Sequence, residues 1–212
     1  METRDMVLAS VTLIVISIAM SAYYYDQLPD TLATHWGING QANGYSPKLE
    51  GLLIIPAISV FIVALFMILP RIDPLRKNYA SFRKYYDGTF VMLTGFFTCL
   101  QALIIFWNLG YAFSFGGMLA FAFGILFYYL GILLEKAKQN WFVGIRTPWT
   151  LSNAKVWDKT HKLGGKLFKA VGMVTFIGAF ILDSILIISV ALVIAAAIAA
   201  VVYSYLEFRK LK

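Results

Sequence analysis

Long apolar runs, each about as long as a lipid bilayer is thick, are the feature that most constrains this chain. An α-helix rises about 1.5 Å per residue and the hydrocarbon layer is about 30 Å thick, so each crossing needs about 20 apolar residues. Hydrophobic residues make up 60% of the 212 positions and charged residues only 14%. This composition is far from that of soluble globular domains. The chain therefore has room for about six membrane-spanning helices and little else.

The boundaries of the apolar runs predict where the helices cross. The expected spans are residues 6–25, 51–69, 90–111, 116–134, 165–182 and 185–206. The last apolar block, residues 170–208, is too long for one crossing, so we place a turn at its polar break, Asp183-Ser184. The second span should end at Pro70, because proline interrupts a helix. We expect an all-α polytopic membrane protein in which residues 1–212 form one domain.

The lysines and arginines indicate the orientation, because these residues concentrate on the cytoplasmic side of membrane proteins. They are dense in residues 70–89, in residues 135–169 and in the C-terminal tail, whereas the loop at 26–50 holds only Lys48. With six spans, every basic residue except Lys48 lies on one side, and a five-span arrangement would move the basic tail to the other. We therefore expect a multi-pass cell-membrane protein with cytoplasmic termini, an extracytoplasmic loop at 26–50 and cytoplasmic segments at 70–89 and 135–164.

The outer loop at 26–50 is too polar to span the bilayer, and its composition predicts an ordered structure. Pro29 fixes its own backbone angle, and glycines such as Gly40 allow turns. We expect a compact loop that rests on the membrane surface. Two interpretations stay open for it. Either His35 and Trp36 are only interfacial anchors, or the loop carries function, as loops on rigid scaffolds often do.

A second polar segment, residues 140–165, precedes the expected fifth span. The residue before Pro148 is disfavoured in a helix, so residues 144–150 should be extended or turned. Ser152 or Asn153 is a plausible N-cap for a helix that continues into the span.

Three residues of that helix are spaced so that they share one face. Trp157, His161 and Gly165 follow each other at intervals of one helical turn, and the small Gly164 and Gly165 favour close contact between membrane helices. A simpler interpretation stays open here as well. In it, tryptophans such as Trp149 are interfacial anchors and the lysines bind anionic lipid headgroups.

A convergent set of catalytic or metal-binding groups is not visible in the sequence. His35 and His161 fall on opposite sides of the membrane in the expected topology, and Cys99 lies within a span. Neither a phosphate-binding glycine loop nor a nucleophile elbow is present. We therefore expect no catalytic residue, no metal, no cofactor and no enzyme activity. The net charge of +7 follows the topology, so direct contact with nucleic acid is not expected either.

A transporter or channel for a neutral or lipidic substrate is the alternative function. Transporters usually keep ionisable residues inside their spans, and here these are limited to Asp183 at a turn and to lysines at the inner end of the fifth span. A pathway lined by Thr94, Thr98 and Gln101 stays open. Gln101 and Asn108 are the strongly polar side chains of the third span.

The two polar segments together resemble those of the SdpI family of bacterial and archaeal membrane proteins. The outer segment carries Leu28-Pro29, His35-Trp36, Gly40 and Lys48, and the inner segment carries Gly144-Ile145-Arg146-Thr147-Pro148-Trp149-Thr150 followed by Trp157, His161 and Gly165. The resemblance extends over nearly the whole chain.

This resemblance implies a function and a set of contact residues. Proteins of the family protect a cell against a secreted antimicrobial peptide that attacks the membrane, and some hold a cytoplasmic transcriptional repressor at the membrane. The implied partners are membrane lipids, a peptide toxin outside and a repressor inside. The residues expected to contact the toxin are Pro29, His35, Trp36, Gly40 and Lys48, and those expected to contact a partner or lipid are Gly144, Arg146, Thr147, Pro148, Trp149, Thr150, Trp157, His161 and Gly165.

Overall fold

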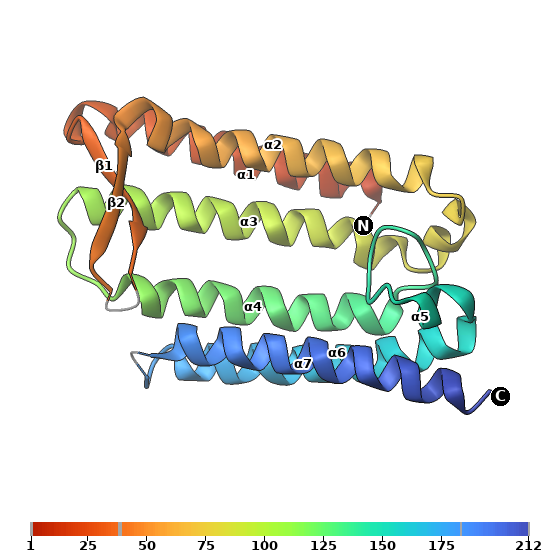
Figure 1. The fold of residues 1–212 in the computed structure, drawn as a ribbon. Helices are drawn as coiled ribbons and strands as arrows, with labels where there is room; N and C mark the ends of the chain where they lie inside the picture. Colours follow the sequence, from red (N-terminus) through yellow and green to blue (C-terminus); the bar gives the residue numbers. More distant parts are fainter. Residues whose placement is uncertain (1, 38–39, 183, 212) are drawn as a thin grey trace.

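The computed structural model describes residues 2–37, 40–182 and 184–211, and it is mostly helical (Figure 1). The helices are α1 (Thr3–Tyr24), α2 (Lys48–Ile72), α3 (Arg83–Asn108), α4 (Phe115–Lys136), α5 (Pro148–Ser152), α6 (Ala154–Gly178) and α7 (Ile185–Arg209), with short 3-10 helices η1 (Tyr25–Gln27) and η2 (Arg76–Ser81). Strands β1 (Thr31–Trp36) and β2 (Ala42–Pro47) form an antiparallel hairpin. The all-α prediction is therefore wrong in the outer loop, where backbone groups pair with each other instead of with water.

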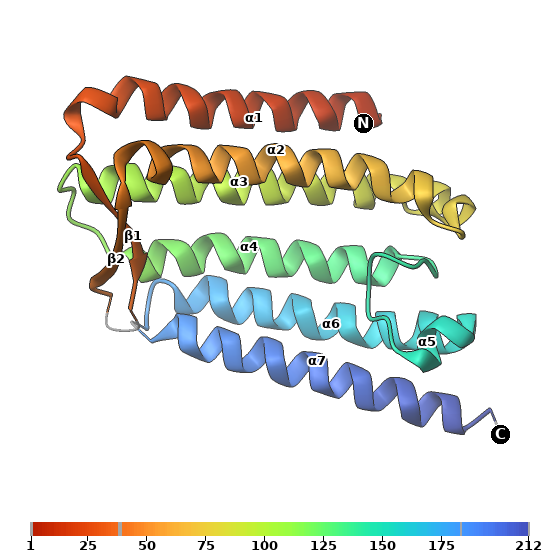
Figure 2. The same ribbon diagram turned by 45° about the horizontal axis from the view of Figure 1, so that its top comes forward.

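The long helices lie side by side in two groups. α1, α2 and α3 pack together, α4, α6 and α7 pack together, and α3 and α4 join the two groups. The hairpin lies at one end of the bundle, whereas α5 and both chain termini lie at the other end (Figure 1, Figure 2). The two polar segments of the sequence are thus separated by the full length of the bundle.

Five helices in the described part of the chain are long and apolar enough to cross a membrane. They are Thr3–Gln27, Lys48–Ile72, Arg83–Asn108, Phe115–Lys136 and Ile185–Arg209. α6 is not among them, because every stretch of it that is long enough to cross contains Lys162, Lys166 and Lys169. At 25 residues it is nevertheless as long as α2 and α7. Composition alone thus supports five crossings, one fewer than the expected six.

The helices extend beyond the apolar runs from which their positions were predicted. α3 begins at Arg83 rather than near residue 90, because an apolar run marks the part of a helix that lies in lipid and not its polar end. The break in the last apolar block falls where it was expected, between Gly178 and Ile185. Asp183, the residue proposed for that turn, lies outside the described residues.

The predicted helix end at Pro70 is wrong, because α2 continues through this proline to Ile72. A proline inside a helix leaves the carbonyl four residues earlier without its usual N–H donor. The Tyr86 hydroxyl on α3 replaces that donor, because it lies 2.7 Å from the Phe66 carbonyl oxygen. A contact between two helices therefore permits what the local sequence disfavours.

Pro56, the other proline inside α2, is compensated in the same way. The carbonyl four residues before it belongs to Leu52, and it accepts a hydrogen bond from Gln101 Nε2 of α3 (3.3 Å). Gln101 is completely buried and also donates to Ser21 Oγ of α1 (2.9 Å). This polar side chain consequently holds α1, α2 and α3 together.

α4 and α6 form the most extensive helix contact and run antiparallel, with glycines along the seam between them. Gly117, Gly124 and Gly131 recur every seven residues on α4, and Gly165 and Gly172 have the same spacing on α6. A Cβ atom on Gly131 would lie 2.7 Å from the Gly165 carbonyl oxygen, and one on Gly124 would lie 2.7 Å from the Phe176 backbone. The two backbones are thus in direct contact, as small residues allow in membrane helices.

Candidate functional site

The β-hairpin is fixed to the C-terminal end of α3 by one amide side chain. Asn108 pairs with the backbone of Ala33 as a neighbouring strand would, accepting from its N–H (2.8 Å) and donating to its carbonyl oxygen (3.0 Å). Leu28 and Leu32 are buried beside it and pack against Leu52 of α2. The outer loop is therefore an ordered hairpin seated on the bundle.

Lys48 and Pro29 lie at the base of the hairpin. The Lys48 N–H donates to the Asp30 carbonyl oxygen (2.8 Å), and its ammonium pairs with the Asp30 carboxylate (3.2 Å). The same ammonium lies 5.0 Å from the centre of the Tyr25 ring. Gly40 lies between the two strands with a φ of 75°, a conformation that favours glycine. Lys48 thus joins the two ends of the loop, and Gly40 allows the chain to reverse.

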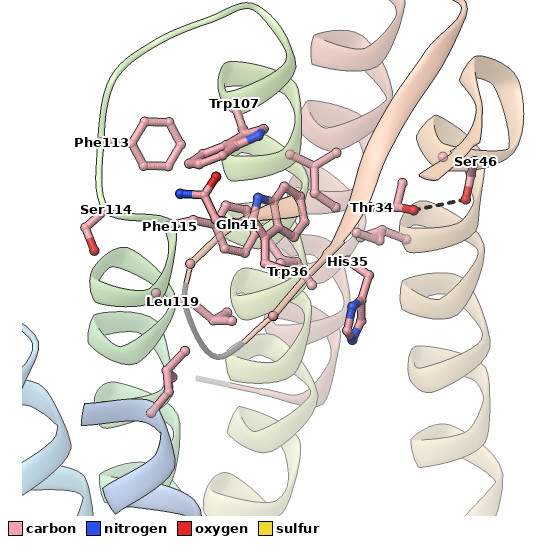
Figure 3. Close-up of a pocket in the computed structure, with 18 of the residues that line it drawn as sticks. Thr34, His35, Trp36, Gln41, Ser46, Trp107, Phe113, Ser114, Phe115 and Leu119 are labelled. Atoms are coloured by element: carbon pink, nitrogen blue, oxygen red, sulfur yellow. Dashed lines mark hydrogen bonds between the residues drawn. The ribbon is translucent and has the colours of Figure 1, made fainter. Parts of the chain in front are cut away.

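A cavity of about 1030 Å³ lies between the hairpin and the helices (Figure 3). Its walls come from the hairpin, the first turns of α2, the C-terminal half of α3, the loop between α3 and α4, and the starts of α4 and α7. α2 and α7 both line the cavity but do not contact each other within the described residues. Their lining residues Ile54, Ile58 and Ile187 are exposed. The cavity therefore opens sideways between α2 and α7, toward the lipid-facing surface of the bundle.

Trp36 lies at the centre of an aromatic wall of this cavity (Figure 3). Its ring stacks on Phe115, with 3.6 Å between the ring centroids and 13° between the planes, and it meets Trp107 edge to face at 5.8 Å. The Trp36 indole Nε1 is buried and has no hydrogen-bond acceptor among the described residues. An unpaired buried N–H costs free energy, so a ligand that supplies an acceptor there would be favoured.

His35 points away from the Trp36 group in Figure 3, as neighbouring residues of a strand do. It is exposed, and its Nδ1 lies 2.6 Å from Asn43 Oδ1, to which it donates. Of the outer residues expected to contact a toxin, His35, Trp36 and Gly40 line the cavity, whereas Pro29 and Lys48 do not.

The inner motif begins with a capped turn at the other end of the bundle. Thr147 is the N-cap of α5, where its Oγ1 accepts from the Thr150 N–H (3.2 Å), and Pro148 occupies the first turn. The prediction that residues 144–150 are extended or turned is therefore wrong from Pro148 onward, because proline is well tolerated at the start of a helix.

The same motif binds to α7. Thr147 Oγ1 lies 3.0 Å from Ser204 Oγ, and the Trp149 ring lies 5.1 Å from the Tyr205 ring. These contacts hold the short helix α5 against the C-terminal end of α7 and give both motif residues a structural role.

α6 carries the remainder of the motif on one face, as expected. Its N-cap is Asn153, and the Trp157 and His161 rings stack with 3.8 Å between their centroids. His161 Nε2 accepts from the Ile145 N–H (2.9 Å), so the ring proton lies on Nδ1 and is donated to the Trp157 carbonyl oxygen (2.9 Å). Burial lowers the pKa of His161 to about 4. The neutral imidazole thus fastens the chain beyond Gly144, whose φ of 123° brings it close to the ring.

A buried polar network supports this segment, and its members were not singled out by sequence analysis. Asn140 Oδ1 accepts from the Val143 N–H (2.7 Å) and lies 3.2 Å from the Tyr79 hydroxyl. That hydroxyl also lies 3.0 Å from Asp73, whose carboxylate accepts from the Trp141 N–H (2.9 Å). Burial, together with the nearby Asp73 carboxylate, raises the pKa of Tyr79, which keeps its hydroxyl a donor. The network joins the loop between α2 and α3 to the inner motif.

Most of the inner motif is enclosed by the protein. The buried members are Thr147, Thr150, Trp157, His161 and Gly165. Arg146 and Pro148 are exposed, and Arg146 donates to the Trp141 carbonyl oxygen (2.7 Å). A lipid or a partner would therefore meet Arg146, Pro148 and nearby lysines rather than the buried side chains.

The titratable side chains do not gather into a metal site. Within residues 2–37, 40–182 and 184–211, no three His, Cys, Asp or Glu side chains lie close enough to hold a metal ion. His35 and His161 belong to β1 and to the first half of α6, at opposite ends of the bundle (Figure 1). The two histidines therefore cannot bind the same metal ion.

Comparisons with known proteins cover both motifs. Residues 136–204 match the SdpI/YfhL protein family, and residues 12–60 match a domain of unknown function, DUF1648. The chain is 27% identical over 203 residues to the immunity protein SdpI of Bacillus subtilis (strain 168), an alignment that covers 95% of each protein. No solved structure matches the chain. The resemblance to the SdpI family is thus confirmed.

Proposed function

We propose that this relative of the SdpI family gives its cell immunity to a secreted, membrane-active peptide, which it binds at the hairpin end of the bundle. The observation that carries the proposal is a cavity built by the outer motif in a chain that aligns over 95% of its length with an immunity protein. Concave sites with mostly apolar walls and a few polar groups are typical of ligand binding. Binding, rather than catalysis, is the activity that this site supports.

The proposal includes a single-domain, six-span topology with both termini in the cytoplasm. Both termini lie at the end of the bundle opposite the hairpin (Figure 1), as an even number of crossings requires. α6 would supply the fifth crossing, because it runs antiparallel along α4. Its lysines concentrate in its inner half, where long side chains can reach the headgroups, and Lys169 pairs with Glu135 of α4 (2.7 Å).

Cysteine labelling tests this orientation. In a Cys99→Ser background, single cysteines at Tyr45 and Ala112 should react with a membrane-impermeant thiol reagent in intact cells, because both side chains are exposed at the hairpin end. A cysteine at Lys155, exposed at the start of α6, should react only after the membrane is opened. Labelling of the Lys155 position in intact cells would reverse the assignment of the two faces.

The basic inner surface would serve a second role in the same function. Arg146, Lys155 and Lys162 are exposed there, and clustered basic residues attract anionic lipid headgroups. We propose that this surface contacts lipid and, in signalling, a cytoplasmic repressor.

A transport pathway has less support from the structure. Gln101 is buried between three helices, and Thr94 and Thr98 each donate to a carbonyl oxygen one turn earlier in α3. None of these three side chains lines the cavity. The polar groups considered for a pathway therefore serve helix packing.

A protection assay tests the proposed immunity. Bacillus subtilis strain 168 deleted for its own SdpI would express this protein or an empty vector and grow beside the unmodified strain. We expect survival to rise at least about tenfold with the protein, and to fall back when His35→Ala and Trp36→Ala are combined, because both residues line the cavity. Immunoblots of membrane fractions would verify equal protein levels. Failure of the parent protein to protect at full membrane level would contradict the proposal.

A further inference from the structure

Glu50 gives the cavity its charge. It is the one charged residue among the described residues that line the cavity, where lysine and arginine are absent. Glu50 is exposed in the first turn of α2 and forms no ion pair within the described chain. The neighbouring Lys48 pairs instead with Asp30. The wall therefore carries a carboxylate with no cation paired to it and favours a ligand that carries a positive charge.

Trp36 adds an unused hydrogen-bond donor to the same wall. Its buried Nε1 lacks an acceptor among the described residues, and the half-buried Trp36 ring itself lines the cavity. Peptide carbonyls are strong acceptors that need a partner away from water. The lining thus combines an anion, a donor and an apolar surface, and an apolar segment of polypeptide with a free amine matches all three.

The size of the cavity limits how much of a peptide can enter. A membrane-spanning helix with a diameter of about 10 Å and a length of about 30 Å occupies about 2400 Å³. The cavity holds about 1030 Å³, which corresponds to about nine helical residues at that diameter. Only one end of a hydrophobic peptide therefore fits. The amino terminus is cationic and the carboxyl terminus anionic, so Glu50 selects the amino terminus.

We infer that the cavity binds the N-terminal segment of a hydrophobic peptide, with its free amine at Glu50, a carbonyl at Trp36 Nε1 and apolar side chains on the aromatic wall. This inference rests on the proposed function, whose peptide it describes chemically. A phospholipid is a poorer match, because its phosphate would meet an anionic wall that offers no lysine or arginine.

Two forms of one synthetic peptide test the inference directly. The probe is the octapeptide Leu-Phe-Leu-Ile-Gly-Phe-Leu-Ser with a dye at its C-terminus, prepared with a free or an acetylated amine. Its binding to the full protein in phosphatidylcholine nanodiscs would be measured by fluorescence anisotropy. We expect the free-amine form to bind at least about tenfold more tightly, as a charge-assisted contact allows.

Substitutions then assign the two polar contacts. Glu50→Gln should abolish the preference for the free amine, whereas Asp26→Asn, which removes an exposed acid that does not line the cavity, should preserve it. Trp36→Phe should weaken both peptide forms about fivefold and leave the preference intact, because it keeps the aromatic ring and removes the N–H. Unfolding midpoints of the variants would verify that each is folded.

The opposite results would overturn the inference. The inference fails if the parent protein binds the two peptide forms with equal affinity. It also fails if Glu50→Gln keeps the preference for the free amine. Absence of peptide binding, together with quenching of tryptophan fluorescence by spin-labelled phosphatidylcholine that Trp36→Phe removes, would identify the cavity as a lipid site. The protection assay separates this inference from the proposed function. If Glu50→Gln protects cells fully, the inferred contact between the peptide amine and Glu50 is rejected and the proposed immunity function is retained. If the parent protein binds the free-amine peptide selectively but does not protect cells, the immunity function alone is rejected.

Discussion

Gly131→Val is expected to destabilise the helix bundle by about 3 kcal/mol or more, which is large for one substitution. A Cβ atom at this position would lie 2.7 Å from both the Gly165 carbonyl oxygen and the Lys169 backbone nitrogen. Backbone atoms cannot turn aside as a flexible side chain can, so α4 and α6 would have to separate. Separation would remove close packing along the most extensive helix contact of the protein. Thermal unfolding of the purified protein in detergent measures the change.

Gly95→Val is the matched control for this prediction. Gly95 lies within α3, and the nearest atom to an added Cβ is Leu13 Cδ1 at 3.9 Å. We expect a change within about 1 kcal/mol, because valine and glycine differ little in helix propensity and no backbone is displaced. Gly131→Ala should lie between the two. Similar unfolding midpoints for Gly131→Val and Gly95→Val would show that α4 and α6 are not held at backbone contact.

The glycine seam illustrates which parts of the fold the sequence could predict. The seven-residue spacing of Gly117, Gly124 and Gly131 is visible in the sequence, but the helix that faces it is not. Apolar runs indicated the five helices that are long and apolar enough to cross a membrane, because each crossing needs a minimum length. The continuation of α2 through Pro70 was mispredicted, since the compensating hydroxyl of Tyr86 comes from another helix. Local rules fail here where a tertiary contact replaces a lost hydrogen bond.

The outer site was predictable in part. Sequence analysis selected His35 and Trp36 and expected a compact loop, but turn-forming residues concealed the hairpin that Asn108 fixes to α3. Glu50 and the aromatic residues of the α3–α4 loop were missed, because the cavity assembles from segments far apart in the sequence. Alternating side-chain directions along β1 could have indicated that His35 and Trp36 point to opposite sides.

For the inner motif, the sequence predicted the arrangement of the helical residues but not the loop contacts that support them. Helical spacing correctly placed Trp157, His161 and Gly165 on one face, because that face follows from the geometry of a single helix. The network of Asp73 and Asn140 was not foreseen, since it joins two loops. Much of the motif is buried, which explains its particular residues through packing and hydrogen bonds.

Acid is expected to destabilise the protein through His161. In the folded protein its Nε2 accepts from the Ile145 N–H, and burial lowers its pKa from 6.5 to about 4. Below pH 6.5 the unfolded chain takes up a proton that the folded chain refuses, so stability falls as the pH decreases and stops falling near pH 4. The full loss is about 3 kcal/mol, since one pKa unit corresponds to about 1.4 kcal/mol. Unfolding midpoints measured from pH 7.5 to about 4 would record this loss.

His161→Phe separates this effect from the titration of the carboxylates. Phenylalanine can keep the stacking on Trp157 but offers no acceptor to the Ile145 N–H, so the variant should be less stable at neutral pH and should lose less stability on acidification. The other histidine provides the control, because His35 is exposed and the chain contains 2 histidines. His35→Phe should therefore keep the pH dependence of the parent. Equal losses of stability by the parent and by His161→Phe between pH 6.5 and about 4 would contradict this account. They would show that His161 does not hold the inner motif in place as a neutral imidazole, which is the role that its hydrogen bonds indicate.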